Sequence, residues 1–303
     1  MRFISALALL ATLAALMPLH HALAETAKGE SMTTQRMRAG REALAKLNPK
    51  AEANLHAALD DIAPDMVEMV VAFGYGDIYA RPGLGVQDRQ VATIAALAAL
   101  GNAEPQLRFH IDGALHAGLS PQEVVEVIYV TTVFAGFPAG LNALVAARQV
   151  FAERGVAPLF PAQPASSEDD RRQRGLAALE ATSKGSGQKV LDMLSDIAPD
   201  MAAFILDFSY GDVISRPGLS PRRKELAMVA AAAARGTMRP QLKVHAHAGL
   251  NVGLTRLELT ELAMQMAGYA GFPAALNALG ALREVFAEAD ANAAANPAAS
   301  VAK

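Results

Sequence analysis

Apolar residues, most of them Ala and Leu, run along the chain in segments of roughly 12 to 17 residues with helical spacing. Ser120-Pro121 and Ser220-Pro221 are helix start signals, and Gly118 and Gly253 are stop signals. No stretch shows the alternation typical of a strand. The pattern therefore predicts an all-α protein, with helices in its first half over 50–62, 64–79, 86–100, 104–117, 121–134 and 138–153.

The same pattern occurs twice. AGFPAGLNAL at 135–144 returns as AGFPAALNAL at 270–279, and the same shift of 135 positions places 61–84 on 196–219 without a gap. This period is too long for a solenoid or propeller unit, so it indicates duplication of a whole domain. We expect two tandem helical-bundle domains over 32–154 and 169–290, a proline-containing linker at 155–168 and a disordered tail at 291–303.

Residues 1–24 combine one basic residue, Arg2, with an apolar run over 4–19 and the small-residue ending Ala22-Leu23-Ala24. This pattern is typical of a secretory signal peptide. The run is shorter than the roughly 20 residues that span a bilayer, so an uncleaved anchor is the weaker alternative. We expect cleavage after Ala24, export to the periplasm or the medium, and no membrane attachment after cleavage.

Composition excludes two function classes. The chain contains no Cys, which rules out disulfides and thiol catalysis. Its formal net charge is −3, and removal of Arg2 makes the charge one unit more negative. With no long basic run, the chain is not expected to bind nucleic acid.

The order of short motifs in both copies resembles the carboxymuconolactone decarboxylase family, whose superfamily includes alkyl hydroperoxidase D. The motifs are FGYGD, RPGL, Leu-x-x-His, Ala-Gly-Leu, a capped Glu-x-x-Glu helix and AGFPAxLNAL, and FGYGD becomes FSYGD in the second copy. The resemblance implies small all-α domains that assemble into rings of dimers. One tandem chain would then replace a dimer, and three chains would form a homo-oligomer.

The hydroperoxide-reducing members of the superfamily carry Cys-x-x-Cys just ahead of the histidine. The corresponding stretches here, 102–109 and 237–244, contain no cysteine. The resemblance to these peroxidases therefore concerns the fold and not the chemistry.

His110 and His245 occupy the same place in the two copies, and helical spacing turns both toward the interior. A core histidine satisfied by a backbone carbonyl is the alternative to a functional one. Glu225 begins the preceding helix of the second copy, and Gln90 takes its place in the first. A Glu225–His245 contact would fix the tautomer and stabilise the protonated ring, as a general acid requires. The alternative is that Glu225 has no role at a site and only stabilises the N-terminus of its helix.

Arg81 and Arg216 precede Pro-Gly-Leu in the loops that lead toward these helices. Their guanidinium groups could bind a substrate carboxylate or cap helix carbonyls. Tyr75 and Tyr210 could donate hydrogen bonds nearby, although a tyrosine packed between helices is the commoner outcome. Since residues two apart on a helix face different sides, His245 and His247 do not predict a metal site.

The resemblance and the candidate residues lead to two hypotheses. The first is a cofactor-free decarboxylase or lyase that acts on a small anionic organic acid or lactone. Its catalytic residues would be His245, Glu225 and His110, and its substrate-binding residues Arg216, Arg81, Tyr210 and Tyr75. The second is a non-enzymatic, oligomeric small-molecule-binding protein, which Gln90 favours because the first copy lacks the acid. If the chain is an enzyme, we expect the second copy to carry most of the turnover.

Overall fold

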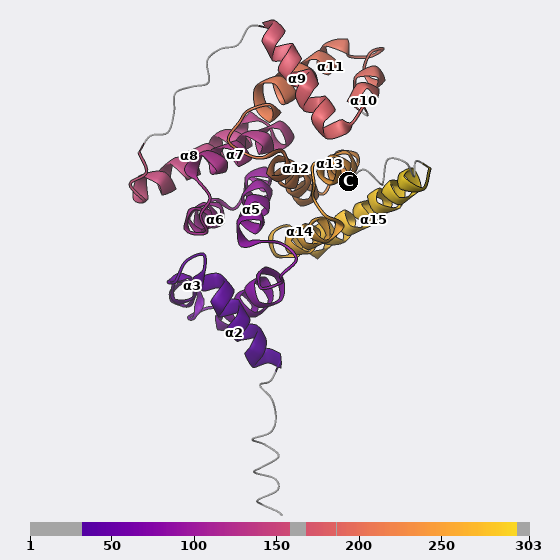
Figure 1. The fold of residues 1–303 in the computed structure, drawn as a ribbon. Helices are drawn as coiled ribbons and strands as arrows, with labels where there is room; N and C mark the ends of the chain where they lie inside the picture. Colours follow the sequence, from indigo (N-terminus) through magenta and orange to yellow (C-terminus); the bar gives the residue numbers. More distant parts are fainter. Residues whose placement is uncertain (1–31, 158–167, 186, 296–303) are drawn as a thin grey trace, which may run out of the picture.

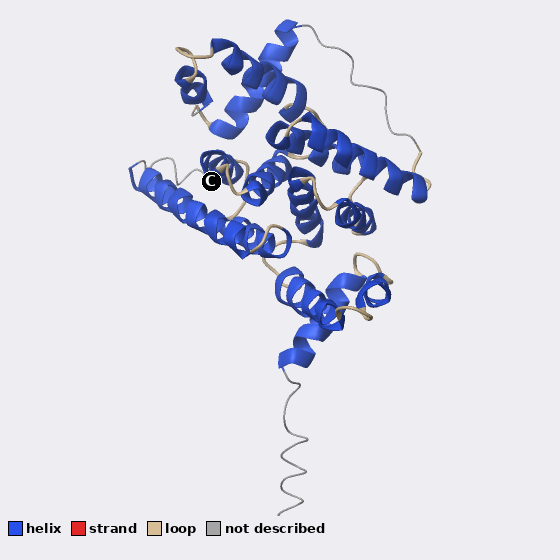
Figure 2. Ribbon diagram, turned by 180° about the vertical axis from the view of Figure 1, so that it is seen from behind, coloured by secondary structure: helices blue, strands red, loops and turns tan. Residues whose placement is uncertain are grey.

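A computed structural model describes residues 32–157, 168–185 and 187–295 (Figure 1). Within these residues every regular element is a helix (Figure 2). The first copy contains α2 (Met32–Ala45), α3 (Ala51–Leu59), α4 (Pro64–Met69), η1 (Val70–Tyr79), α5 (Val86–Leu100), α6 (Glu104–His116), α7 (Pro121–Ala135) and α8 (Phe137–Glu153). The second contains α9 (Glu168–Ser183), α10 (Gly187–Met193), α11 (Pro199–Phe204), η2 (Ile205–Ile214), α12 (Pro221–Arg235), α13 (Arg239–Asn251), α14 (Arg256–Tyr269) and α15 (Phe272–Ala295).

The predicted all-α fold with two tandem domains is confirmed. Ser120 and Thr255 cap α7 and α14, each in a capping box with the glutamate three residues later. The predicted helix over 64–79 is instead α4 followed by the π-helix η1, and η2 repeats this arrangement in the second copy. The last helix continues to Ala295, beyond the predicted start of the tail at 291. Residues 1–24 and 158–167 lie outside the described part of the chain, as do residues 296–303.

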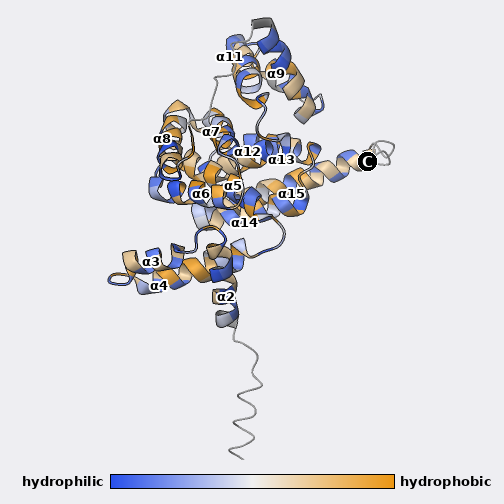
Figure 3. Cartoon of the chain, turned by 60° about the vertical axis from the view of Figure 1, so that its left-hand side comes forward, coloured by the Kyte–Doolittle hydropathy of each residue, from blue (hydrophilic) through white to orange (hydrophobic). Residues whose placement is uncertain are grey.

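Helices α5 and α12 lie side by side at the centre of the molecule (Figure 1). Residues 89–99 of α5 and 224–234 of α12 are buried all around, as expected of helices that other helices surround. One hydrophobic core runs through both copies and includes residues of both central helices. In Figure 3 hydrophobic residues, in orange, lie on α5 and on helices around it. The two copies therefore fold around a shared core.

The contacts between copies come in matched pairs, as a pseudo-two-fold axis requires. Helix α7 packs against α12 and η2, and its counterpart α14 packs against α5 and η1. The N-terminal helices of the two copies lie at opposite ends of the molecule, α2 against η1 and α9 against η2 (Figures 1 and 2). Each π-helix therefore packs against a helix of the other copy: η1 against α14, and η2 against α7.

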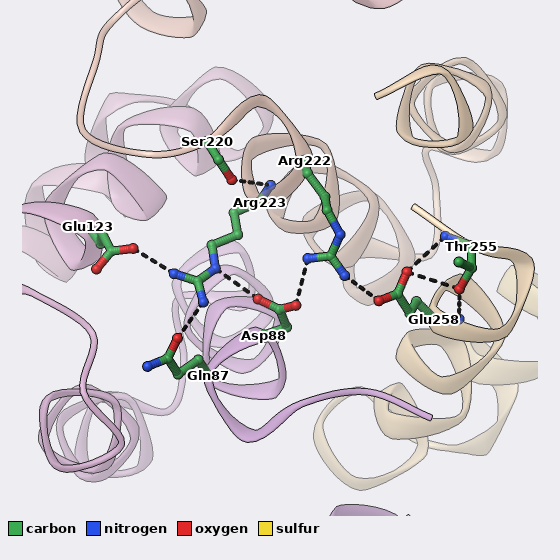
Figure 4. Close-up of polar contacts among 8 residues, drawn as sticks. All are labelled: Gln87, Asp88, Glu123, Ser220, Arg222, Arg223, Thr255 and Glu258. Carbon is green, nitrogen blue, oxygen red and sulfur yellow. Dashed lines mark hydrogen bonds and ion pairs between the residues drawn. The ribbon is translucent and has the colours of Figure 1, made fainter. Parts of the chain in front are cut away.

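A polar cluster joins the starts of α5 and α12 across the axis (Figure 4). Asp88 accepts from Arg223 Nε at 2.8 Å and from Arg222 Nη1 at 2.6 Å. Arg223 also donates to Glu123 and to Gln87, at 2.6 and 2.5 Å. Positions 88 and 223 are equivalent in the duplicated sequence, so one position carries opposite charges in the two copies.

Candidate functional site

The repeated AGFPA motif makes the turn that builds each site. Gly136 and Gly271 adopt φ of 85° and 87°, a region that favours glycine, and the next residue begins α8 or α15. Helix α8 then packs against α6, and α15 packs against α13, which are the two helices that carry the histidines. The motif therefore closes a helix over each histidine helix.

The second copy contains the predicted carboxylate–imidazole contact. His245 Nδ1 on α13 lies 2.8 Å from Glu225 Oε2 on α12. The glutamate side chain is 1% exposed and the histidine side chain 12% exposed. A carboxylate at Nδ1 favours a proton on that nitrogen, which leaves Nε2 to exchange protons. Within the described residues, Nε2 has no hydrogen-bond partner.

Two aromatic side chains border this pair. Phe134, which α7 of the first copy supplies, packs edge-on against His245 with 5.0 Å between ring centroids. Burial raises the pKa of Tyr210 above its ordinary range, and the negative charge of Glu225 raises it further. Tyr210 is therefore a neutral phenol that can donate a hydrogen bond close to Glu225. The second site thus joins a carboxylate–imidazole pair that has one unbonded ring nitrogen with one phenol and one apolar wall.

The first copy places the same histidine in a closed site, with an uncharged partner at each ring nitrogen. His110 Nδ1 lies 3.0 Å from Gln90 Oε1, and Nε2 lies 3.1 Å from the hydroxyl of Tyr269, which belongs to the second copy. Burial lowers the pKa of His110 to about 3, so the ring is neutral near pH 7. Gln90 Nε2 is buried without a partner in the described chain. Turning the amide over would let this nitrogen donate to Nδ1, with Nε2 then donating to Tyr269.

The hydroxyl of Tyr269 belongs to a buried network that spans both copies. It donates to the hydroxyl of Tyr79 at 2.9 Å, which lies 2.7 Å from Thr93 Oγ1. Gln265 donates to Thr93 at 2.8 Å and accepts from the fully buried Arg89 at 3.0 Å. At the first site both ring nitrogens of the histidine are therefore occupied by protein groups.

The predicted arginines join the two copies and do not contact the histidines. Arg81 donates through Nε to Glu261, at 2.9 and 3.0 Å to its two oxygens. Arg216 donates through Nε and Nη2 to Glu126, and its guanidinium lies 4.7 Å from the centroid of the Tyr129 ring. Neither arginine caps the preceding helix in these contacts.

The remaining predicted residues behave as packing or surface groups. Tyr75 is buried, with its ring centroid 5.1 Å from that of Tyr79. His247 Nε2 bonds to Glu288 at 2.8 Å, so the two histidines of α13 take separate partners. In the described ranges, no three His, Asp or Glu side chains gather closely enough to hold a metal ion. None of the helices described combines the length and hydropathy needed to cross a bilayer.

The sequence prediction missed the aromatic residues that reach each site from the other copy, Phe134 and Tyr269, as well as Tyr79. No local motif marks them. Phe134 and Tyr269 each directly precede the AGFPA motif, and a comparison of the two copies position by position exposes their difference. The tyrosine at 269 and the phenylalanine at the equivalent position 134 are the sequence signal for a polar first site and an apolar second site.

Comparison with known proteins supports the resemblance. A profile of the carboxymuconolactone decarboxylase family matches residues 64–149 and 199–284, together more than half of the chain. The chain is 36% identical over 100 residues to 4-carboxymuconolactone decarboxylase of Acinetobacter baylyi, a match that covers 33% of this chain and 74% of that protein. It is 32% identical over 125 residues to an uncharacterised 15.0 kDa protein of Paracoccus denitrificans, covering 41% of this chain and 93% of that one.

One solved structure matches most of the tandem arrangement. It comes from Burkholderia xenovorans and is described as a gamma-carboxymuconolactone decarboxylase subunit. The sequences are 28% identical with a TM-score of 0.51, and the match covers 84% of this chain and 98% of that one. With both halves matched by the family profile, the chain belongs to the carboxymuconolactone decarboxylase family, as two tandem domains.

Proposed function

We propose that the His245–Glu225 pair is the general acid–base site of a cofactor-free carboxy-lyase that acts on a small organic acid or lactone. The observation that carries the proposal is the 2.8 Å contact between His245 Nδ1 and a buried carboxylate, together with an Nε2 that has no partner among the described residues. The carboxylate orients the ring and stabilises its protonated form while Nε2 points away from it.

The chemistry suits a conjugated lactone that carries a carboxylate. When the bond to the carboxylate carbon breaks, carbon dioxide leaves and the electron pair moves into the lactone carbonyl as an enolate. His245 then delivers a proton from Nε2 to carbon, and the ring regains a proton from water after the product leaves. Tyr210 is suited to stabilise the enolate oxygen, because it is neutral and donates a hydrogen bond.

Arg216 keeps a more limited role in this proposal. Its Nε and Nη2 edge is taken by Glu126, so a substrate carboxylate would have to approach Nη1. Arg81 is bonded through Nε alone, and its side chain is more exposed. Binding of a substrate carboxylate by either arginine stays a prediction.

The alternative function is a non-enzymatic small-molecule-binding protein on the same fold. The first site favours it, since His110 is neutral and enclosed there. The two functions differ in whether the second site turns a substrate over.

The test is release of carbon dioxide from 4-carboxymuconolactone by the purified protein. We expect His245→Ala and Glu225→Gln each to lower the rate by roughly 10²-fold or more, the usual scale for loss of a general acid or its partner. His110→Ala should cost much less. His247→Ala is the matched control, since it removes a histidine from the same helix that pairs only with Glu288. Equal losses from His110→Ala and His245→Ala would contradict the asymmetry, and ligand-induced thermal shifts without turnover would favour the binding protein.

We also propose that the protein is exported after cleavage behind Ala24, on the strength of the short apolar run in residues 4–19. Mass spectrometry of the exported protein tests this proposal. A mature chain that retains Arg2 would contradict it.

A further inference from the structure

The residue that faces each histidine from the other copy differs between the two sites by a single hydroxyl. Tyr269 ends α14 and lies against His110, with ring centroids 5.2 Å apart and planes at 80°. Phe134 lies near the end of α7 against His245, at 5.0 Å and 69°. Positions 134 and 269 are equivalent in the duplicated sequence, so two matched aromatic rings hold nearly the same pose.

The hydroxyl occupies the nitrogen that a general acid would use. Tyr269 lies 3.1 Å from His110 Nε2, while Gln90 takes Nδ1. At the second site Glu225 takes Nδ1, and no described residue hydrogen-bonds Nε2 of His245. The two histidines thus differ in the availability of Nε2 as well as in the partner of Nδ1.

The neighbours of Tyr269 are polar, and the equivalent neighbours of Phe134 are apolar. Tyr79, Thr93 and Gln265 support the hydroxyl of Tyr269. Their equivalents at the second site are all apolar: Ile214, Met228 and Val130. A tyrosine at position 134 would therefore find none of this support, and we expect its hydroxyl to bond to Nε2 of His245.

We propose that the paired positions 134 and 269 decide which histidine can exchange a proton with a bound molecule. Tyr269 closes the first site by engaging Nε2 of His110, and Phe134 leaves Nε2 of His245 open. Both are positioning residues that act through the histidine. The inference rests on the proposed function of His245, but its test requires no substrate.

Carbethoxylation by diethyl pyrocarbonate, located by peptide mass mapping, measures the accessibility of each imidazole nitrogen. In the unsubstituted protein His245 should react and His110 should not. Phe134→Tyr should slow the reaction of His245 by roughly tenfold, the scale of one hydrogen bond. His247 and His56, in the same sample, should react at unchanged rates. Phe286→Tyr is the matched control, because it adds a hydroxyl beneath Arg256 and should leave His245 unchanged.

The reciprocal variant is read by ¹⁵N NMR of the imidazole rings. Tyr269→Phe should shift the Nε2 resonance of His110 toward that of an unbonded nitrogen, with His245 unaffected. Tyr129→Phe removes a hydroxyl from the ring beneath Arg216 and should shift neither histidine. An unchanged His245 rate in folded Phe134→Tyr, or an unchanged His110 resonance in folded Tyr269→Phe, overturns the proposal. Absence of carbon dioxide release with both readouts as expected would instead refute the proposed enzyme activity alone.

Discussion

His110 is buried without a charged partner, so its ring is held in the neutral form and cannot act as a general acid near pH 7. The residue is 3% exposed, and burial lowers its pKa to about 3. The unfolded chain has a histidine pKa of about 6.5, so between these values the unfolded state binds more protons than the folded state. Because of His110, the free energy of unfolding has its full value above pH 6.5 and decreases as the pH falls toward 3.

Replacing His110 should remove this part of the acid sensitivity. Between pH 7 and pH 5 we expect the free energy of unfolding to fall by about 2 kcal/mol more in the parent than in His110→Gln, since an unfolded histidine gains its proton over this interval. Urea unfolding at the two pH values measures the difference. Equal slopes for His110→Gln and the parent would refute the enclosed, neutral histidine.

Glycines set the packing of the N-terminal helix of each copy against its π-helix. A Cβ added to Gly40 of α2 would lie 2.1 Å from the carbonyl oxygen of Val71, and one added to Gly76 of η1 would lie 2.3 Å from that of Arg36. Gly175 and Gly211 repeat this close approach in the second copy. Because the obstructing atoms belong to the backbone, a side chain cannot be accommodated by a rotamer change.

We therefore expect Gly76→Ala to destabilise the protein by about 2 kcal/mol or more, within the usual range for overpacking against a fixed neighbour. Gly74 lies in the same π-helix with nothing within 4 Å of an added Cβ, and the second copy has Ser209 there. Gly74→Ala should be neutral or slightly stabilising. Thermal unfolding of the two variants provides the comparison, and similar losses for both would contradict the packing argument.

Local sequence was enough for most helices but not for the π-helices or the complete site. Capping residues and glycine stops act within a few residues, so the ends of α7 and α14 could be predicted. The π-helix η1 packs closely against α2, and no local sequence pattern records this tertiary contact. The spacing of Glu225 and His245 predicted their contact, because both lie on consecutive helices of one copy. Phe134 arrives from the other copy, so only the three-dimensional structure places it at the site.

Duplication allowed the two halves of the molecule to become complementary. At the equivalent positions 88 and 223 the first copy has an aspartate and the second an arginine, and these two residues pair across the axis (Figure 4). Two identical copies would place like charges opposite each other at this point, which is destabilising. The cluster therefore favours pairing of a first copy with a second copy.

A double-mutant cycle tests this complementarity. We expect Asp88→Asn and Arg223→Gln each to lower the free energy of unfolding, with a coupling energy of about 1 kcal/mol or more, since both side chains are mostly shielded from water. Arg239→Gln with Glu284→Gln is the control cycle, because that pair is about half exposed and should show little coupling. Equal coupling in the two cycles would contradict a special role for the pair on the axis.

The surface of the molecule carries two related apolar faces that suit assembly. Phe137 and Leu141 are exposed on α8, and the Phe137 ring lies 5.6 Å from that of Phe208 in the second copy. Phe272 and Leu276 form the equivalent face on α15, where the Phe272 ring lies 5.6 Å from that of Phe73. Each face thus combines elements of both copies. We expect these two faces to be contact surfaces between chains.

We expect light scattering to give a particle mass near three times that of one chain, as proposed from the family's rings, because two faces on each chain allow a closed ring. Leu141→Glu combined with Leu276→Glu should yield single chains with unchanged helix content, since each interface would then bury unpaired carboxylates. Leu257→Glu changes another exposed leucine, on α14 and outside both faces, and should leave the particle intact. A parent protein that is strictly monomeric, near the 31.7 kDa of the full chain or less, would contradict the ring while leaving the pairing of the two copies within one chain unaffected.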